Sequence, residues 1–122
     1  MKKMYFLIGC LIVLLSSSCQ WHNGVDITVS EDEEVFKMTA HYYPEKTKQV
    51  HEFLDKYFLD KTNFSFTNNY IDERITLNDH TTFYLKTRPG NFGIRFNKTK
   101  NTSQSYEEVK KMCDEVKNII AQ

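Results

Sequence analysis

The sequence predicts an α+β protein in which two amphipathic helices cover one face of an antiparallel sheet of about five strands, in the order ββαβββα. The prediction depends on five segments with apolar residues at every second position and on two segments with helical periodicity. Such a sheet and two such helices bury their apolar faces most simply as a two-layer sandwich with both helices on one side. A chain of 122 residues accommodates one domain of this kind.

The first two strands are expected in residues 25–29 and 35–43. Apolar and polar residues alternate in both segments, and the acidic segment 30–34 interrupts them like a turn, so we expect a hairpin. In the second segment one face would carry Phe36, Met38, Ala40 and Tyr42, and the other Lys37, Thr39 and His41.

The first helix is expected over residues 44–59. Pro44 suits a first helical turn, where its missing N–H group costs nothing. The apolar residues at helical spacing are Val50, Phe53, Leu54, Tyr57 and Phe58. Glu52 and Asp55 flank His51, and we interpret these three as part of a solvated polar face rather than as a proton relay.

Three strands of an antiparallel meander are expected over residues 64–77, 81–88 and 92–97. The connectors 78–80 and 89–91 are rich in turn-forming residues. The buried face would be filled by Ile71, Ile75, Leu77, Phe83, Leu85, Phe92, Ile94 and Phe96. Gly93 lies inside the last strand, where a glycine marks a bulge or a close contact.

The second helix is expected to begin at Ser105, because Ser105 and Glu108 match a capping box. Its apolar stripe consists of Val109, Met112, Cys113, Val116, Ile119 and Ile120. Cys113 lies on this stripe, so we expect a buried and unreactive thiol.

The first 19 residues have the parts of a secretory signal. Lys2 and Lys3 precede a twelve-residue apolar run, which is short for a membrane span, and Ser16, Ser17 and Ser18 lead to Cys19. This segment resembles the signal of bacterial lipoproteins, whose lipobox ends in a cysteine, although Ser16 stands where that family prefers Leu. Cys10 also ends a lipobox-like stretch, but only a short apolar core would precede it.

The resemblance implies that residues 1–18 are removed and that Cys19 carries lipid. Residues 19–24 would then be a tether and residues 25–122 a single α+β domain, anchored to a membrane of the cell envelope. In this family an Asp after the lipidated cysteine marks inner-membrane retention, so Gln20 implies the outer membrane. An uncleaved membrane anchor or a buried helix is the alternative interpretation.

Composition and motifs point away from catalysis, cofactors and nucleic acid. Removing residues 1–18 removes Lys2 and Lys3 and no acid, which leaves 14 basic residues against 16 acidic ones, whereas nucleic-acid binding usually needs a basic surplus. The four histidines, His22, His41, His51 and His80, lack metal-ligand spacing. No nucleophile elbow or phosphate-binding glycine loop occurs. We therefore expect a protein that is not an enzyme and that has no cofactor and no metal.

One stretch has an uneven charge distribution. No acidic residue lies between Asp79 and Glu107, and the cationic residues in this span are Lys86, Arg88, Arg95, Lys98 and Lys100. Two interpretations remain open: a chance cluster on the solvated side of a sheet, and a face that binds an anionic partner.

Two functional hypotheses follow. The first is a membrane-anchored, non-enzymatic envelope lipoprotein that binds an envelope protein partner, as an accessory subunit or an immunity-type inhibitor. The alternative is a small periplasmic ligand-binding protein or enzyme whose site is assembled from scattered polar residues such as His41, Asp72, Arg74 and Arg88.

Overall fold

The computed structural model describes residues 24–68 and 70–122. Its strands are β1 (Asp26–Glu31), β2 (Val35–His41), β3 (Ile71–Thr76), β4 (Thr82–Arg88) and β5 (Asn91–Asn97). Its α-helices are α2 (Thr47–Tyr57) and α3 (Ser103–Ala121), and its 3₁₀ turns are η2 (Pro44–Lys46) and η3 (Lys98–Lys100). The predicted order ββαβββα is confirmed.

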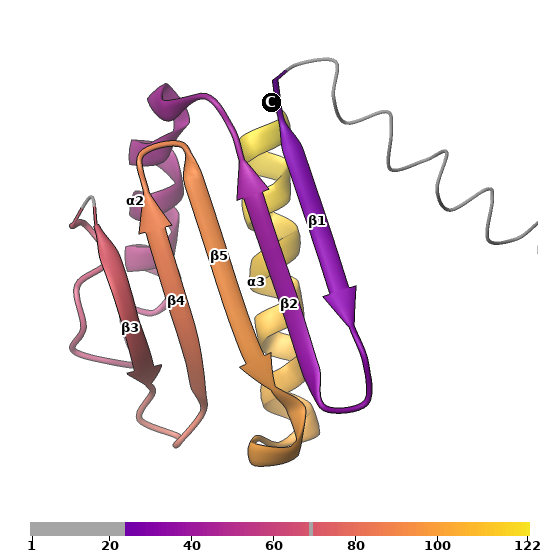
Figure 1. Cartoon of the computed structure of the whole chain (residues 1–122). Coiled ribbons are helices and arrows are strands. Elements are labelled where there is room, and N and C mark those ends of the chain that lie inside the picture. The colour runs from indigo at the N-terminus through magenta and orange to yellow at the C-terminus, as the bar shows by residue number, and fades with distance from the viewer. Residues whose placement is uncertain (1–23, 69) are drawn as a thin grey trace, which may run out of the picture.

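All five strands form one antiparallel sheet in the order β1-β2-β5-β4-β3 (Figure 1). The hairpin β1–β2 and the meander β3–β4–β5 each form from neighbouring segments, as predicted. The two units meet where β2 pairs with β5, two strands that are separated in the chain by η2, α2, β3 and β4. This long-range pairing therefore makes one sheet of two local units.

Two of the hairpin turns follow directly from their residues. The carboxylate Oδ1 of Asp32 accepts hydrogen bonds from the backbone N–H groups of Glu34 and Val35, each at 2.8 Å. Between β4 and β5, Gly90 has φ 79°, and a Cβ atom there would lie 2.8 Å from the carbonyl oxygen of Tyr42. Only glycine fits this position, which explains the Pro89-Gly90 turn.

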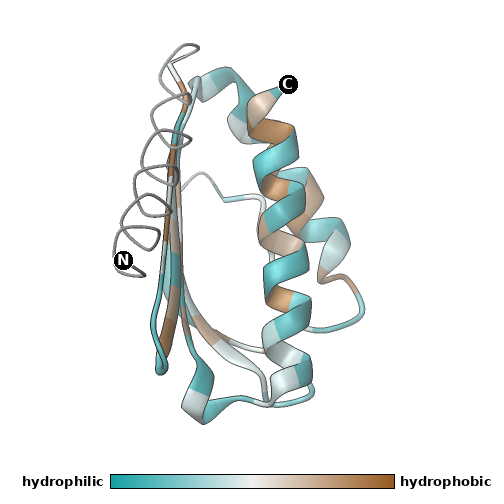
Figure 2. Ribbon diagram, turned by 90° about the vertical axis from the view of Figure 1, so that its right-hand side faces the viewer, coloured by the Kyte–Doolittle hydropathy of each residue, from teal (hydrophilic) through white to brown (hydrophobic). Residues whose placement is uncertain are grey.

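The sheet and the helices form two layers, with α2 and α3 on the same face of the sheet (Figure 2). The apolar residues expected to face this interior from residues 36–42 and 71–96 are all buried, and so are Val50, Leu54, Phe58, Val109, Met112 and Val116 on the helices. In the edge strand β1, Ile27 is only partly buried and Val29 is exposed. Cys113 is buried as well, and burial raises the pKa of its thiol to about 12.

Side-chain hydrogen bonds connect the helices to their surroundings. The hydroxyl of Tyr57 on α2 donates to the carbonyl oxygen of Glu108 on α3 at 3.2 Å. The ammonium of Lys46 donates to the carbonyl oxygen of Gln122 at 3.0 Å, beyond the last residue of α3. Ser105 and Thr81 share a buried hydroxyl–hydroxyl bond of 2.6 Å. These bonds hold both ends of α3.

The predicted strand over residues 64–77 is wrong in its first half, because only Ile71–Thr76 pairs in the sheet. Phe64 and Phe66 alternate with polar residues, which is the pattern of a strand. Their rings instead pack beside α2, where Phe66 stacks on Phe58 with centroids 5.0 Å apart. The backbone N–H of Phe66 donates to Asp55 Oδ1 at 3.0 Å, so a side chain takes the place of a strand partner.

The predicted start of the second helix is also wrong. α3 begins at Ser103, and its N-cap is Thr102, whose hydroxyl accepts from the N–H of Ser105 at 3.0 Å. Ser105 lies inside the helix and is buried against Thr81. The first helix differs less, since Pro44 opens the 3₁₀ turn η2 and the α-helix itself runs from Thr47 to Tyr57.

The expected signal segment 1–18 and the lipidation site Cys19 lie outside the described residues. Among the helices that the structure does describe, none is both long and apolar enough to cross a membrane.

Candidate functional site

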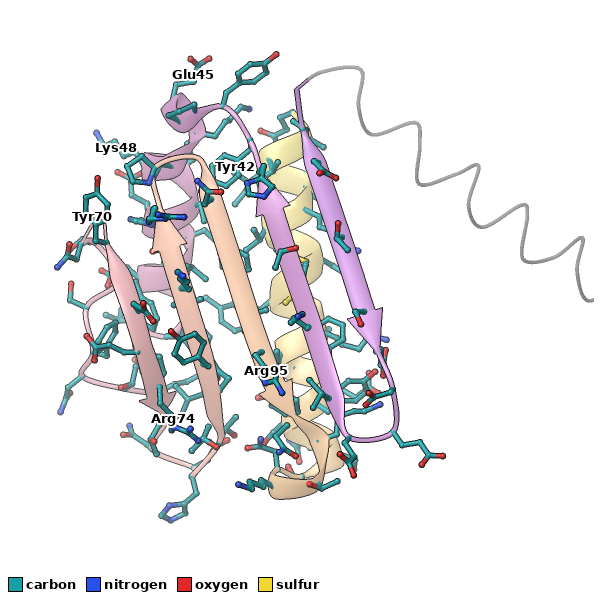
Figure 3. The ribbon with its side chains drawn as sticks, in the orientation of Figure 1. Tyr42, Glu45, Lys48, Tyr70, Arg74 and Arg95 are labelled. Carbon is teal, nitrogen blue, oxygen red and sulfur yellow. The ribbon has the colours of Figure 1, made fainter. Side chains whose placement is uncertain are left out.

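The described elements leave one face of the sheet uncovered. We call this surface, opposite α2 and α3, the open face. Figures 1 and 3 look directly onto it, and Figure 3 labels Arg74 and Arg95 on its lower half. Because successive side chains of a strand point to opposite faces, the residues between the buried ones project from the open face.

Nine of the outward positions on the three central strands form a grid of three rows. The pairing of β2 with β5 and of β5 with β4 defines these rows as Lys37–Arg95–Tyr84, Thr39–Gly93–Lys86 and His41–Asn91–Arg88. The middle position of the grid is Gly93, which has no side chain. Residues directly opposite each other in adjacent strands lie about 5 Å apart, so the side chains of the grid are immediate neighbours.

Positive charge dominates this grid. Lys37, Lys86, Arg88 and Arg95 are all exposed, and none of them forms an ion pair with another described residue. The outer strands add one cation and two acids: Arg74 and Asp72 from β3, and Asp26 from β1. The cations therefore surround the centre of the face, and the two aspartates lie at its two sides.

Shallow hollows follow the line of β5 across the grid. A hollow of about 240 Å³ lies on the side of Asn91, between His41 and Arg88. A second, of about 180 Å³, lies on the side of Arg95, between Lys37 and Tyr84. Gly93, Thr39 and Lys86 line both hollows, so the missing side chain of Gly93 joins them.

The structure brings together most of the predicted basic cluster. Lys86, Arg88 and Arg95 share the open face, and Lys100 on η3 lines a further hollow of about 140 Å³ together with Arg74 and Arg95. Sequence reasoning did not include Lys37 in this cluster. The alternation in its strand already put Lys37 on the polar side, but nothing local indicates that β2 lies next to β5.

Lys98 does not belong to the open face. Its ammonium lies 2.8 Å from Glu31 Oε2 and 5.2 Å from the centre of the Tyr106 ring on α3. The hydroxyl of Tyr106 donates to the same carboxylate oxygen. The hydrogen bond from Lys98 lowers the pKa of Glu31, and the bond to Glu31 raises the pKa of Lys98. The charge of Lys98 is thus partly neutralised within the protein.

His51 departs from its expected solvated position, because it is only 3 % exposed and faces the core from α2. Its Nε2 atom has no hydrogen-bond partner among the described residues, and burial lowers the pKa of the imidazole. Asp55 is occupied by the N–H of Phe66, and Glu52 lies 3.9 Å from the ammonium of Lys48 at the surface. The three residues do not form a relay.

A hollow of about 520 Å³ lies at the start of α2. It is lined by His51 and Thr47, by the rings of Pro44 and Pro89, and by Glu45, Lys48, Glu52 and Thr67. Glu45 and Lys48 lie at the upper end of the molecule in Figure 3. Charges of both signs line its rim, so it has no clear preference for an anion or a cation.

Of the scattered polar residues named as an alternative site, His41 and Arg88 line one hollow, but Asp72 and Arg74 lie apart from His41. His41 lies on β2, whereas Asp72 and Arg74 lie on β3, and β5 and β4 separate these strands. Three steps between neighbouring strands correspond to about 14 Å. Within residues 24–68 and 70–122, no group of three or more His, Cys, Asp or Glu side chains is arranged to hold a metal ion.

The open face is thus suited to attract anions and to donate charge-assisted hydrogen bonds to them. Comparison with known protein families, with curated proteins and with solved structures finds no match to this chain.

Proposed function

We propose that this chain is a lipid-anchored, non-enzymatic binding protein of a bacterial cell envelope, which docks an acidic protein partner on the open face of its sheet. The observation that carries the proposal is the set of exposed cations on that face, none in an ion pair with a described residue. Exposed cations of this kind accelerate association with an acidic partner and select against basic ones.

The proposed lipid on Cys19 would keep this face close to a membrane. Five residues separate Cys19 from Val25, which is already buried in the core. An extended chain spans about 3.4 Å per residue, so the tether reaches about 20 Å at most. A partner in the same envelope compartment would therefore meet the open face at a high local concentration.

The test is capture of partners by the full chain from detergent-solubilised envelope membranes, at low and high salt. We expect one acidic protein in stoichiometric amount, with less of it at high salt, because salt screens exposed charges over about 8 Å at physiological ionic strength. The double substitution Arg88→Glu with Arg95→Glu should abolish this capture. Circular dichroism should show an unchanged fold, since both side chains project into solvent.

A matched control reverses two cations on the helical layer. Lys56→Glu with Lys111→Glu changes the net charge by the same amount, and both side chains are exposed. This variant should capture the partner as the unchanged protein does. Equal loss in both double variants would indicate a general charge effect and would contradict docking on the open face.

A second candidate function is binding of a small molecule in the hollow of about 520 Å³ at the start of α2, where the buried His51 forms part of the wall. Native mass spectrometry of the full chain in detergent distinguishes the two candidates. A bound compound that is lost on substitution His51→Phe supports the second, and a bound protein supports the first.

A further inference from the structure

Gly93 lies at the centre of the open face although its strand does not need a glycine there. It pairs in register with Thr39 on one side and Lys86 on the other, so the bulge considered from the sequence is absent. Its φ is not positive, unlike those of Gly24 and Gly90. Glycine weakens a strand interior because it loses more conformational freedom on folding than other residues.

Packing does not require glycine at this position either. A Cβ atom on Gly93 would lie 3.7 Å from the carbonyl oxygen of Lys86 and 3.8 Å from Cγ2 of Thr39, which are ordinary van der Waals distances. A Cβ atom, and so an alanine, is therefore permitted at this position. The consequence of the glycine is the hollow itself, which continues along β5 from Asn91 to Arg95.

The groups around this hollow are suited to a negative charge. Lys37, Lys86, Arg88 and Arg95 all contribute to its walls, and no acidic residue does. Four residue steps along a strand correspond to about 13 Å, which is enough for a short extended segment of a partner. The hollow thus combines the shape for a side chain with the charge for a carboxylate.

The positions of Asp26 and Asp72 distinguish a carboxylate segment from a broad anionic surface. These aspartates lie in the outer strands, in register with His41 and Lys86. An anionic bilayer laid across the whole face would come close to both of them and be repelled. A carboxylate entering at Gly93 lies next to Lys86 and Arg95 and two strands away from each acid.

We propose that the hollow over Gly93 is a carboxylate-binding subsite, which receives an Asp or Glu side chain of an acidic protein segment laid along β5. This rests on the proposed function and names the chemical group that the open face recognises. Lys86 and Arg95 flank the entering carboxylate and donate hydrogen bonds to it, and Arg88 lies toward the other end of the segment.

The subsite is tested by titrating the full chain, in a neutral detergent, with a short oligoglutamate peptide and with oligoglutamine as control. We expect binding of oligoglutamate alone. Substitution Gly93→Val fills the hollow and leaves every charge in place, and it should weaken oligoglutamate binding about tenfold, the loss expected for a hydrogen bond to a charged group. Gly93→Ala should give a smaller loss and serves if the valine variant does not fold.

A control is Thr76→Val, which places a valine at an exposed open-face position on β3 outside the grid. It should leave oligoglutamate binding unchanged. If Gly93→Val also binds normally while Arg88→Glu with Arg95→Glu binds neither the peptide nor the captured partner, the subsite is overturned and docking by charge remains. If the double variant also retains the partner, the proposed function itself is overturned.

Vesicles of phosphatidylglycerol, compared with phosphatidylcholine, form the last arm of the experiment. The proposal expects Gly93→Val to leave vesicle binding unchanged. Vesicle binding that depends on Gly93, together with no preference for oligoglutamate over oligoglutamine, would identify a lipid headgroup as the occupant and overturn the carboxylate segment.

Discussion

His51 lies on the inward face of α2, where the sequence suggested a solvated histidine between two acids. Thr47, His51 and Leu54 are all buried, at a spacing of four and then three residues, which is one face of an α-helix. The helical spacing alone therefore predicts that His51 faces the core. Its polar neighbours in the sequence, Glu52 and Asp55, had suggested that it faces solvent.

Burial of His51 makes stability depend on pH. Its pKa is lowered by burial from the ordinary value of 6.5, so below about pH 6.5 the unfolded chain binds a proton that the folded chain excludes. The free energy of unfolding should therefore fall between pH 7 and pH 5. This window lies above the range in which the carboxylates Glu31, Asp32 and Asp79, whose pKa values are also lowered, become protonated.

The substitution His51→Leu removes this titration while keeping a side chain of comparable size. Urea unfolding of both proteins at pH 7.5 and pH 5 should show the leucine variant gaining stability relative to the unchanged chain as the pH falls. The same stability difference at both pH values would show that His51 is not responsible.

At the scale of elements, the N-cap of α3 is Thr102, three residues before the Ser105 that the sequence motif suggested. Ser105 matches a capping box, but its hydroxyl is shared with Thr81 in the core, at 2.6 Å. The N-cap is instead Thr102, which is exposed and has the extended backbone of an N-cap. A tertiary hydrogen bond thus decides which of two candidate residues begins the helix.

The cap can be tested with a matched pair of variants. Thr102→Ala should lower the free energy of unfolding by about 1 kcal/mol, the usual cost of losing an N-cap. Glu108→Ala, which would remove the other half of the predicted capping box, should change stability by less than about 0.5 kcal/mol. Urea unfolding measures both values, and the reverse order would restore Ser105 and Glu108 as the cap.

The two neighbouring apolar residues of α2 differ in burial. Leu54 is fully buried, whereas Phe53 is only partly buried at the edge of the core. Leu54→Ala should therefore cost about 2–5 kcal/mol. Phe53→Ala should cost less than Leu54→Ala despite the larger side chain. Thermal or urea unfolding gives the order, and a greater loss at Phe53 would mean that α2 is rotated on the sheet.

At the scale of the whole molecule, the two faces of the sheet differ. One packs its apolar side chains against α2 and α3, and the opposite one is the open face. The chain is electrically neutral overall, with 16 basic and 16 acidic residues. The cations on the open face are thus a local excess created by folding, since Lys37 comes from the hairpin and the others come from the meander.

The proposed anchor is a property of the whole chain. Cys19→Ala should move the protein from the membrane fraction, where only detergent releases it, to a soluble or unprocessed form, because two or more acyl chains are needed for stable anchoring. Fractionation with mass spectrometry of the N-terminal peptide measures this. Cys10→Ala is the control and should have no effect, and lipid found on Cys10 would contradict the assignment.

The sequence by itself determined the fold class, the element order and nearly every buried apolar residue. These properties depend on periodicity, which is local: alternation defines β2, β4 and β5, and helical spacing defines α2 and α3. The same periodicity gave a wrong strand at Phe64 and Phe66. Alternation indicates that one side of an extended segment is buried, but it does not indicate whether another strand pairs with that segment.

Only the tertiary structure decided which strands are neighbours and therefore what the open face contains. The pairing of β2 with β5 brings Lys37 beside Arg95 and puts Gly93 at the centre of the grid. Lys98 is separated from the cluster, because it forms an ion pair with Glu31 at the turn of the β1–β2 hairpin. These contacts join residues far apart in the chain, and their register is selected by the packing of the whole core, so no local pattern of residues carries them.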